Sequence, residues 1–183
     1  MPFANAPAPF EVLVVDDEPE TQDLLSEFCR SLGLEVAVAS DGRAATAAIE
    51  SDPARYRVVL TDLHMPGADG FQVLHAARAA NASSYVVIIT GYATIDTAVR
   101  AVREGAYDFL AKPFSLGQLE TILWRIRDRM ALEQHNRELM HEVDDARQMA
   151  EQGPGTTSLD WRLGLIDERL SNIEAALRAL THP

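Results

Sequence analysis

Short apolar runs that each end at a polar side chain are the feature that limits the fold of this chain most strongly. Such runs, with helical patterns between them, are typical of buried strands in a parallel sheet. Because the carboxyl ends of parallel strands lie at one edge of the sheet, the polar side chains should meet there, where α/β sheets bind ligands. The runs 12–15, 58–60 and 85–89 are followed by Asp16 with Asp17, by Thr61 with Asp62, and by Thr90.

Strand and helix patterns alternate along the first 115 residues. The expected strands are 11–15, 34–39, 57–61, 85–90 and 107–111, and the expected helices are 20–32, 43–50, 70–80, 95–104 and one that starts near 115. Five strands with helices between them, apolar on both faces, predict an α/β fold with a five-stranded doubly wound parallel sheet. Right-handed crossovers then place Lys112, after the fifth strand, at the same edge as Asp62.

The residues expected at this edge are Asp16, Asp17, Asp62, Thr90 and Lys112. Three carboxylates repel one another unless a cation lies among them, and ligands that are all oxygen favour Mg²⁺. An aspartate neutralised by magnesium can attack a phosphoryl group, so Asp62 is a candidate phosphate acceptor. Lys112 would contact the phosphoryl oxygens, and Thr90 would hydrogen-bond one of them. Lys112 is also the only lysine among the 16 Lys and Arg residues.

Four motifs contain these residues: Val-Val-Asp-Asp-Glu-Pro, Thr-Asp-Leu-His-Met-Pro-Gly-Ala-Asp-Gly, Ile-Ile-Thr-Gly-Tyr-Ala-Thr and Gly-Ala-Tyr-Asp-Phe-Leu-Ala-Lys-Pro-Phe. With them, residues 10–127 resemble the response-regulator receiver domain of bacterial two-component systems, which has a flavodoxin-like sheet. Residues 90–114 are most similar to receivers of the enhancer-binding transcription activators. The resemblance implies phosphorylation by a histidine kinase or a phosphotransfer protein. It implies no enzyme activity beyond Mg²⁺-dependent phosphorylation and dephosphorylation of the chain's own aspartate.

The resemblance also implies a role for each matching residue. His64 and Tyr92, each two positions after a motif residue, are candidates for tuning the attack of water on the aspartyl phosphate. The implied roles are phosphoacceptor for Asp62, metal ligands for Asp16, Asp17 and the backbone carbonyl of His64, switch hydroxyl for Thr90, phosphate-pairing cation for Lys112 and switch aromatic for Phe109.

The region after the receiver has its own heptad patterns. A seam over 128–151, continuous with the last receiver helix, predicts a coiled coil, and Asn136 within it favours a parallel homodimer. Residues 152–157 read as a linker, 158–181 as an amphipathic heptad helix and 1–9 as a disordered arm. The heptad helix needs a surface to pack on, which is the long helix if it folds back, its own copy in an oligomeric bundle, or a different protein. The seam residues are Leu132, Asn136, Leu139 and Val143, and the heptad residues are Leu163, Ile166, Leu170, Ile173, Leu177 and Leu180.

Composition limits the possible partners. The net charge of −12 opposes binding to nucleic acid. No apolar run approaches the roughly 20 residues of a membrane span, and a single cysteine suits a reducing compartment, so we expect a cytoplasmic protein. The leading prediction is a response regulator whose output is helical dimerisation and protein contact without DNA binding. The alternative is a regulatory fragment of a transcription activator, or a minimal DNA-binding regulator.

Overall fold

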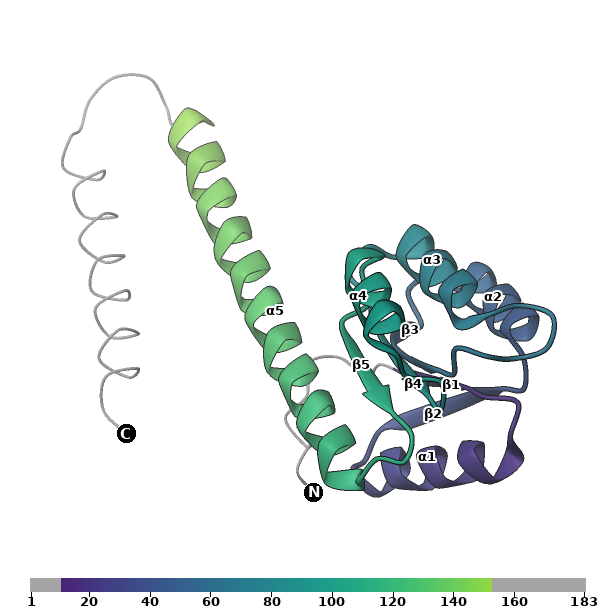
Figure 1. The fold of residues 1–183 in the computed structure, drawn as a ribbon. Coiled ribbons are helices and arrows are strands. Elements are labelled where there is room, and N and C mark those ends of the chain that lie inside the picture. The colour runs from purple at the N-terminus through teal and green to yellow at the C-terminus, as the bar shows by residue number, and fades with distance from the viewer. Residues whose placement is uncertain (1–10, 153–183) are drawn as a thin grey trace. The chain divides into compact units, whose positions relative to one another are not determined.

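The computed structural model describes residues 11–152, and within them five strands alternate with five helices (Figure 1). Each element lies where the sequence predicts it, and its ends differ from the predicted ends by at most one residue wherever a bound was predicted. The elements are β1 (Glu11–Val15), α1 (Pro19–Ser31), β2 (Glu35–Ala39), α2 (Gly42–Ser51), β3 (Tyr56–Thr61), α3 (Gly70–Ala80), β4 (Tyr85–Thr90), α4 (Ile95–Arg103), β5 (Asp108–Ala111) and α5 (Leu116–Gln152).

The strands form one parallel sheet in the order β2-β1-β3-β4-β5, which confirms the predicted doubly wound α/β fold. Val15, the last residue of β1, pairs with Thr61, the last residue of β3. Thr90, at the end of β4, pairs with Ala111, at the end of β5. This register brings the residues that follow these strands to one edge of the sheet.

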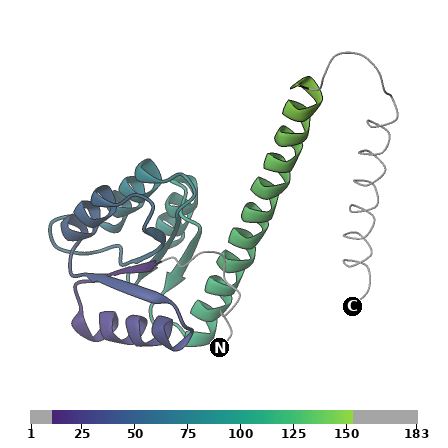
Figure 2. The same cartoon turned by 180° about the vertical axis from the view of Figure 1, so that it is seen from behind.

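Helices cover both faces of the sheet. Figures 1 and 2 show α1 and the first part of α5 on one face and α2, α3 and α4 on the other. Val12 and Val14 pack on the face of α1 and α5, whereas Leu13 and Val15 pack on the opposite face, as the two-residue period of a strand requires. Cys29 of α1 is fully buried in the first layer, and this burial raises the pKa of its thiol to about 12. The thiol is therefore a neutral packing group.

The apolar residues of helix α5 are buried in its first turns and exposed farther along. Its first turns bury an apolar stripe that includes Leu119, Leu123 and Ile126. Farther along, Leu132, Leu139 and Val143 are 60%, 45% and 52% exposed. The compact unit that contains the sheet ends at Arg137, and the helix itself continues to Gln152. The predicted helical continuation is thus present, while the coiled-coil pairing and the domain limits at 127 and 151 stay predictions.

Some predicted segments lie outside the described residues. These are the arm 1–9, the linker after Gln152 and the heptad helix 158–181 with its six apolar residues Leu163, Ile166, Leu170, Ile173, Leu177 and Leu180. Among the helices of residues 11–152, none combines the length and the apolar character that a bilayer span requires.

Candidate functional site

Asp62 is held by backbone contacts at the end of β3. Its N–H donates to the carbonyl of Val15, 2.8 Å away, which joins it to the end of β1. Its carboxylate is buried, and Oδ2 accepts a hydrogen bond from the N–H of His64 at 2.6 Å. Gly70, the first residue of α3, packs so closely that a Cβ there would lie 2.3 Å from the carbonyl oxygen of Asp62. The position of this carboxylate therefore follows from the paths of β3 and α3.

Asp16 lies beside Asp62 at the end of β1. It is 1% exposed, and its Oδ1 accepts a hydrogen bond from the N–H of Glu18 at 3.0 Å. Its own carbonyl accepts a hydrogen bond from the side-chain amide of Gln22, on the first turns of α1. Asp17, the second residue of the predicted metal-binding pair, is exposed. The two adjacent aspartates thus lie in different surroundings.

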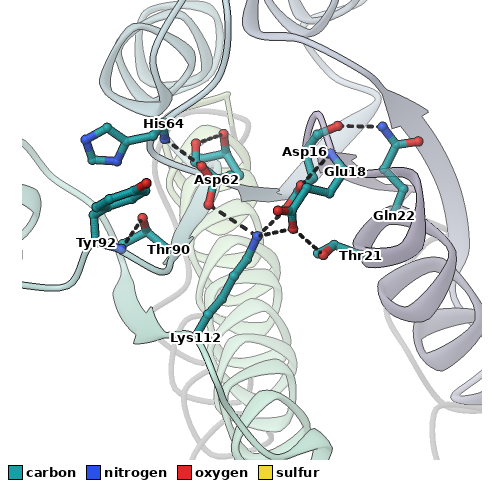
Figure 3. A network of polar contacts seen from close by, with 10 residues as sticks. Asp16, Glu18, Thr21, Gln22, Asp62, His64, Thr90, Tyr92 and Lys112 are labelled. Carbon is teal, nitrogen blue, oxygen red and sulfur yellow. Dashed lines mark hydrogen bonds and ion pairs between the residues drawn. The ribbon is translucent and has the colours of Figure 1, made fainter.

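Lys112 joins the two buried carboxylates (Figure 3). Its Nζ lies 2.8 Å from Oδ2 of Asp16 and 3.3 Å from Oδ1 of Asp62, and Oε2 of Glu18 is 3.6 Å away. The N–H of Lys112 donates to the carbonyl of Thr90 at 2.8 Å, which fixes the end of β5 against the end of β4. The single ammonium therefore offsets part of the repulsion between two carboxylates that are both shielded from water.

The pKa shifts follow from this arrangement. Burial raises the pKa of Asp62, and the charge of Asp16 raises it further, whereas the His64 N–H and Lys112 act in the opposite direction. Burial tends to lower the pKa of Lys112, but the hydrogen bond to Asp16 and the charges of both carboxylates outweigh it, so this pKa is raised. The site thus carries more negative charge than Lys112 alone compensates.

The oxygen atoms at this edge suit a magnesium ion. The predicted ligands, Asp16, Asp17, Asp62 and the backbone carbonyl of His64, are all hard oxygen donors. Within residues 11–152, no three acidic, histidine or cysteine side chains already lie in an arrangement that would hold a metal ion. Nζ of Lys112 bridges two of the carboxylates instead. A divalent cation would neutralise the same buried carboxylates, so the residues fit the ion.

The predicted switch residues lie on the neighbouring strands. Thr90 is fully buried at the end of β4, and its Oγ1 accepts a hydrogen bond from the N–H of Tyr92 at 3.2 Å. Phe109 on β5 is half-buried against the core layer of α2, α3 and α4. The rings of His64 and Tyr92 lie 4.7 Å apart at an angle of 53° (Figure 3). The two candidate tuning residues are therefore direct neighbours.

Two contact residues were not among the predicted site residues. Glu18 places its carboxylate near Lys112 and accepts a hydrogen bond from Oγ1 of Thr21. Gln22 holds the carbonyl of Asp16. The signals in the sequence are weak: Glu18 directly follows the acidic pair, and Gln22 lies one helical turn after Glu18. The structure brings Asp16, Asp62 and Lys112 into direct contact, with Thr90 at the same edge. The seam residue Asn136 is exposed on α5.

Comparison with known proteins agrees with this geometry. Residues 12–123 match the family model for the response regulator receiver domain. The C4-dicarboxylate transport transcriptional regulatory protein DctD of Pseudomonas aeruginosa is 40% identical over 62% of this chain and 24% of its own length. The regulatory protein AtoC of Escherichia coli is 36% identical over 71% of this chain and 27% of its own. The chain thus spans about a quarter of the length of these relatives.

Solved structures give the same result. A response regulator receiver domain protein from Clostridium thermocellum superposes with a TM-score of 0.63 at 28% identity, covering 67% of this chain and 98% of that one. NtrX from Brucella abortus superposes with a TM-score of 0.64 at 34% identity, covering 72% of this chain and 30% of that one. With the family model matched over most of the sheet and its helices, this chain belongs to the response regulator receiver domain family.

Proposed function

We propose that this chain is a response regulator that accepts a phosphoryl group on Asp62 from a histidine kinase or a phosphotransfer protein. The observation that supports this most is the pairing of the buried Asp62 carboxylate with Lys112 and Asp16 at the carboxyl edge of the sheet. Receiver domains interact with histidine kinases and generally bind Mg²⁺. The resulting acyl phosphate would be the signal that the rest of the chain responds to.

In the proposed reaction, one carboxylate oxygen of Asp62 forms a bond to phosphorus while the bond between phosphorus and the donor group breaks. Bound Mg²⁺ would offset the repulsion between Asp62 and the incoming phosphoryl group. Lys112 would then pair with a phosphoryl oxygen, because its ammonium already lies 3.3 Å from Asp62. The Thr90 hydroxyl would donate to another phosphoryl oxygen.

Receiver domains are generally not true enzymes. We expect only phosphorylation of this chain's own Asp62 from a donor, followed by slow hydrolysis of the aspartyl phosphate. His64 follows Asp62 by two positions, and its ring contacts that of Tyr92. These two rings are the side chains that we propose to limit the approach of water to the phosphorus.

The proposed switch begins at Thr90 and ends at α5. Movement of Thr90 toward the phosphate would free space for Phe109, which is half-buried on β5, to turn inward. This would change the surface formed by α4, β5 and α5. Because α5 is one continuous helix as far as Gln152, a change at its start can reach the seam at Leu132, Leu139 and Val143.

The proposed output is helical dimerisation and contact with other proteins. The exposed apolar residues of the seam support it, since a helix with no buried face gains little stability in water. Asn136 at a seam position favours a two-stranded parallel pair. Residues 158–181 would add a second assembly or partner-binding helix.

A specific observation favours an alternative function. One relative is named a transcriptional regulatory protein, and the matched chains are about four times as long as the matching region. The chain would then be the regulatory part of a transcription activator, or a minimal DNA-binding regulator. The net charge of −12 opposes direct DNA contact. A gel shift with promoter DNA at low salt would detect such binding.

Phosphorylation of Asp62 can be tested with Mg²⁺ and a small phosphodonor such as acetyl phosphate. Intact-mass spectrometry should show one added phosphoryl group on the wild type and none on Asp62→Asn. Asp69→Asn is the matched control, because Asp69 lies in the same loop and asparagine caps α3 equally well. This variant should be phosphorylated like the wild type. Labelling of Asp62→Asn at the wild-type level would disprove the assignment.

Light scattering with and without beryllofluoride tests the dimer. Leu139→Asp places a charge on the seam and should give a monomer, whereas His141→Asp places the same charge two positions away from the seam and should not. Both residues are exposed on α5, so neither change disturbs the core. A wild-type chain that stays monomeric in both states would contradict the dimer and leave the phosphorylation proposal intact.

A further inference from the structure

A second cluster of charged side chains lies at the amino edge of the sheet, where β3 and β4 begin, opposite to Asp62. Its centre is Glu133 of α5, whose Oε1 accepts a hydrogen bond from the hydroxyl of Tyr85 at 2.7 Å. Arg57 and Arg129 place guanidinium nitrogens 3.6 Å and 3.7 Å from the Glu133 carboxylate. Three elements, β3, β4 and α5, therefore meet at one carboxylate.

A cavity of about 430 Å³ opens beside this cluster. Its walls come from α3, from the two loops that precede β4 and β5, and from α5. The rings of Tyr85 and Tyr107 form an apolar corner, with centroids 5.1 Å apart and an edge-to-face angle of 84°. The lining residues that matter here are Arg78, Ser83, Tyr85, Gly105, Tyr107 and Arg129.

Positive charge exceeds negative charge around this cavity. Arg78, Arg129 and Glu133 are the charged residues that line the cavity, and Arg57 adds a third guanidinium 3.6 Å from the Glu133 carboxylate, although the whole chain carries a net charge of −12. Burial raises the pKa of Tyr85 to about 12, so its hydroxyl stays protonated and keeps donating to Glu133. Nε and Nη2 of Arg57 are buried without a hydrogen-bond acceptor. Donors are therefore in excess over acceptors at this edge.

Backbone contacts hold the guanidinium of Arg78 in one position. Its Nη1 donates to the carbonyls of Ala82 and Ser84, and this fixes the plane of the guanidinium. On its other side lies Gly105, whose φ of +93° disfavours any side chain and where a Cβ would be 3.7 Å from Nε. Glycine thus places no side chain of its own against Nε of Arg78.

We propose that this cavity binds a small organic anion with a phosphate or carboxylate group and a flat apolar part. The planar guanidinium of Arg78 offers two parallel donors of the kind that bind such groups, and Arg129 supplies a second positive charge. Tyr85 and Tyr107 supply the apolar contact. Ser83 lines the cavity, is exposed and can donate an additional hydrogen bond.

Binding at this site would act on α5. Arg129 and Glu133 belong to the turn of α5 next to the seam residue Leu132, and Arg78 belongs to α3. An anion that bridges Arg78 and Arg129 would fasten this turn to the amino edge of the sheet. Because a ligand that binds only the folded state stabilises it, the Tm should rise with ligand concentration.

Phenylphosphonate is a suitable probe. It carries a dianionic head and a flat ring, and its carbon–phosphorus bond does not deliver a phosphoryl group to Asp62. Titration of the full-length Asp62→Asn variant, followed by backbone NMR shifts, should give a dissociation constant on the order of 1 mM or lower. The shifts should concentrate at residues 82–85 and 105–107.

Three variants locate the site. Arg78→Gln and Arg129→Gln should each weaken binding about tenfold, the change that corresponds to ~1.4 kcal/mol. Arg125→Gln, on the same helix but paired with Asp108 outside the cavity, is the matched control and should bind like the parent. Because Arg78 also supports the loop before β4, Ser83→Asp serves as a variant that removes no side-chain contact of Arg78 and should abolish binding by repulsion.

Saturable shifts at the amino edge that respond to Arg78→Gln, Arg129→Gln and Ser83→Asp would support the site. Shifts that do not saturate, or that respond equally to Arg125→Gln, would show nonspecific attraction and overturn the proposal. Shifts confined to the Asp62 edge would overturn it as well. Inorganic phosphate as a second probe separates the two ligand features, since it should bind more weakly if the tyrosine corner contributes.

Discussion

The Asp62 site and the Glu133 cluster, at opposite edges of the sheet, have opposite charge balances and are held in place by different kinds of contact. At the carboxyl edge, two buried carboxylates share one ammonium, and backbone contacts from Val15, His64 and Gly70 hold Asp62 in place. At the amino edge, beside the starts of β3 and β4, the guanidinium groups of Arg57 and Arg129 lie near the carboxylate of Glu133, and side chains make every contact to that carboxylate that the structure shows among residues 11–152. The Asp62 site has more carboxylates than cations, and the Glu133 cluster has more cations than carboxylates.

This difference indicates what each edge is suited to bind. A site with surplus carboxylate and a fixed backbone suits a divalent cation and a reaction that needs one oxygen at a defined position. A site with surplus guanidinium beside a cavity suits an anion. The comparison can be tested by removing one group from each edge and measuring the free energy of unfolding.

The largest effect is expected at the backbone of the carboxyl edge. A Cβ added by Gly70→Ala would lie 2.3 Å from the carbonyl oxygen of Asp62 and 3.0 Å from Cα of Leu63, so α3 or β3 must shift. We expect the free energy of unfolding in urea to fall by about 3 kcal/mol. Gly91→Ala is the control, because its Cβ would meet no atom within 4 Å. Equal stability of the two variants would show that Asp62 is not held by the close approach of α3.

The next effect is expected at the amino edge. Glu133→Ala leaves the hydroxyl of Tyr85 without its acceptor and leaves Arg57, 18% exposed, without its nearby carboxylate. We expect a loss of roughly 2 kcal/mol in the free energy of unfolding. Glu27→Ala, at an exposed site on α1, should change it by less than about 0.5 kcal/mol. If both variants were equally stable, the contacts of Glu133 would contribute nothing measurable to the free energy of unfolding.

Removing a carboxylate from the carboxyl edge should increase the free energy of unfolding, in contrast to the two losses above. The pKa of Asp62 is raised chiefly by burial, so its ionisation above the ordinary value of 3.8 costs stability. Asp62→Asn removes this cost and leaves Lys112 to Asp16 alone, and we expect a gain of about 1 kcal/mol in urea unfolding at pH 7. The gain should shrink as the pH falls, because protonation neutralises Asp62 in the wild type. A destabilised Asp62→Asn would mean that Lys112 fully compensates both carboxylates.

The same comparison explains what the sequence could predict. Asp16, Asp62, Thr90 and Lys112 each stand directly after an apolar run, so the strand pattern alone brings them to one edge. The close approach at Gly70 also belongs to the backbone path, although the pattern identified Gly70 only as the start of a helix. The fold and the residues that meet at the carboxyl edge could therefore be predicted, because both depend on where the strands end.

The amino edge could not be predicted in this way. Tyr85 and Glu133 are 48 positions apart, and each fits an ordinary pattern, Tyr85 as the first residue of a strand and Glu133 as a charged residue on a long helix. Their contact depends on the phase of α5 where it crosses the start of β4, and a heptad pattern does not fix that phase relative to the sheet. Glu18 and Gln22 lie close to Asp16 in the sequence, but their contacts depend on side-chain conformations at the start of α1, which the strand pattern does not specify.

The smallest effect on the free energy of unfolding is expected from the hydroxyl of Tyr85. It can be recognised by its dependence on pH. At pH 8, Tyr85→Phe should cost only about 0.5 kcal/mol, because Arg57 and Arg129 still compensate Glu133. Burial raises the pKa of Tyr85 from 10.0 to about 12, so the folded chain holds this proton more tightly than the unfolded chain. That contribution is fully present below pH 10 and is lost as the pH rises toward 12, a loss that Tyr85→Phe should not show.

The pKa of Lys112 is also raised, so the carboxyl edge should lose stability as the pH rises above 10.5. This loss of stability should remain in Tyr85→Phe. Urea unfolding of both proteins at several pH values from 8 to 11 therefore separates the two edges: the difference between the curves reports Tyr85, and the remaining slope includes Lys112. The stability difference should shrink above pH 10 and then change sign, because the loss linked to the raised pKa of Tyr85 exceeds about 0.5 kcal/mol before pH 11. If the two curves instead stayed parallel over this range, the pKa of Tyr85 would not be raised, and its hydroxyl would be neither shielded from water nor bound to Glu133 in solution.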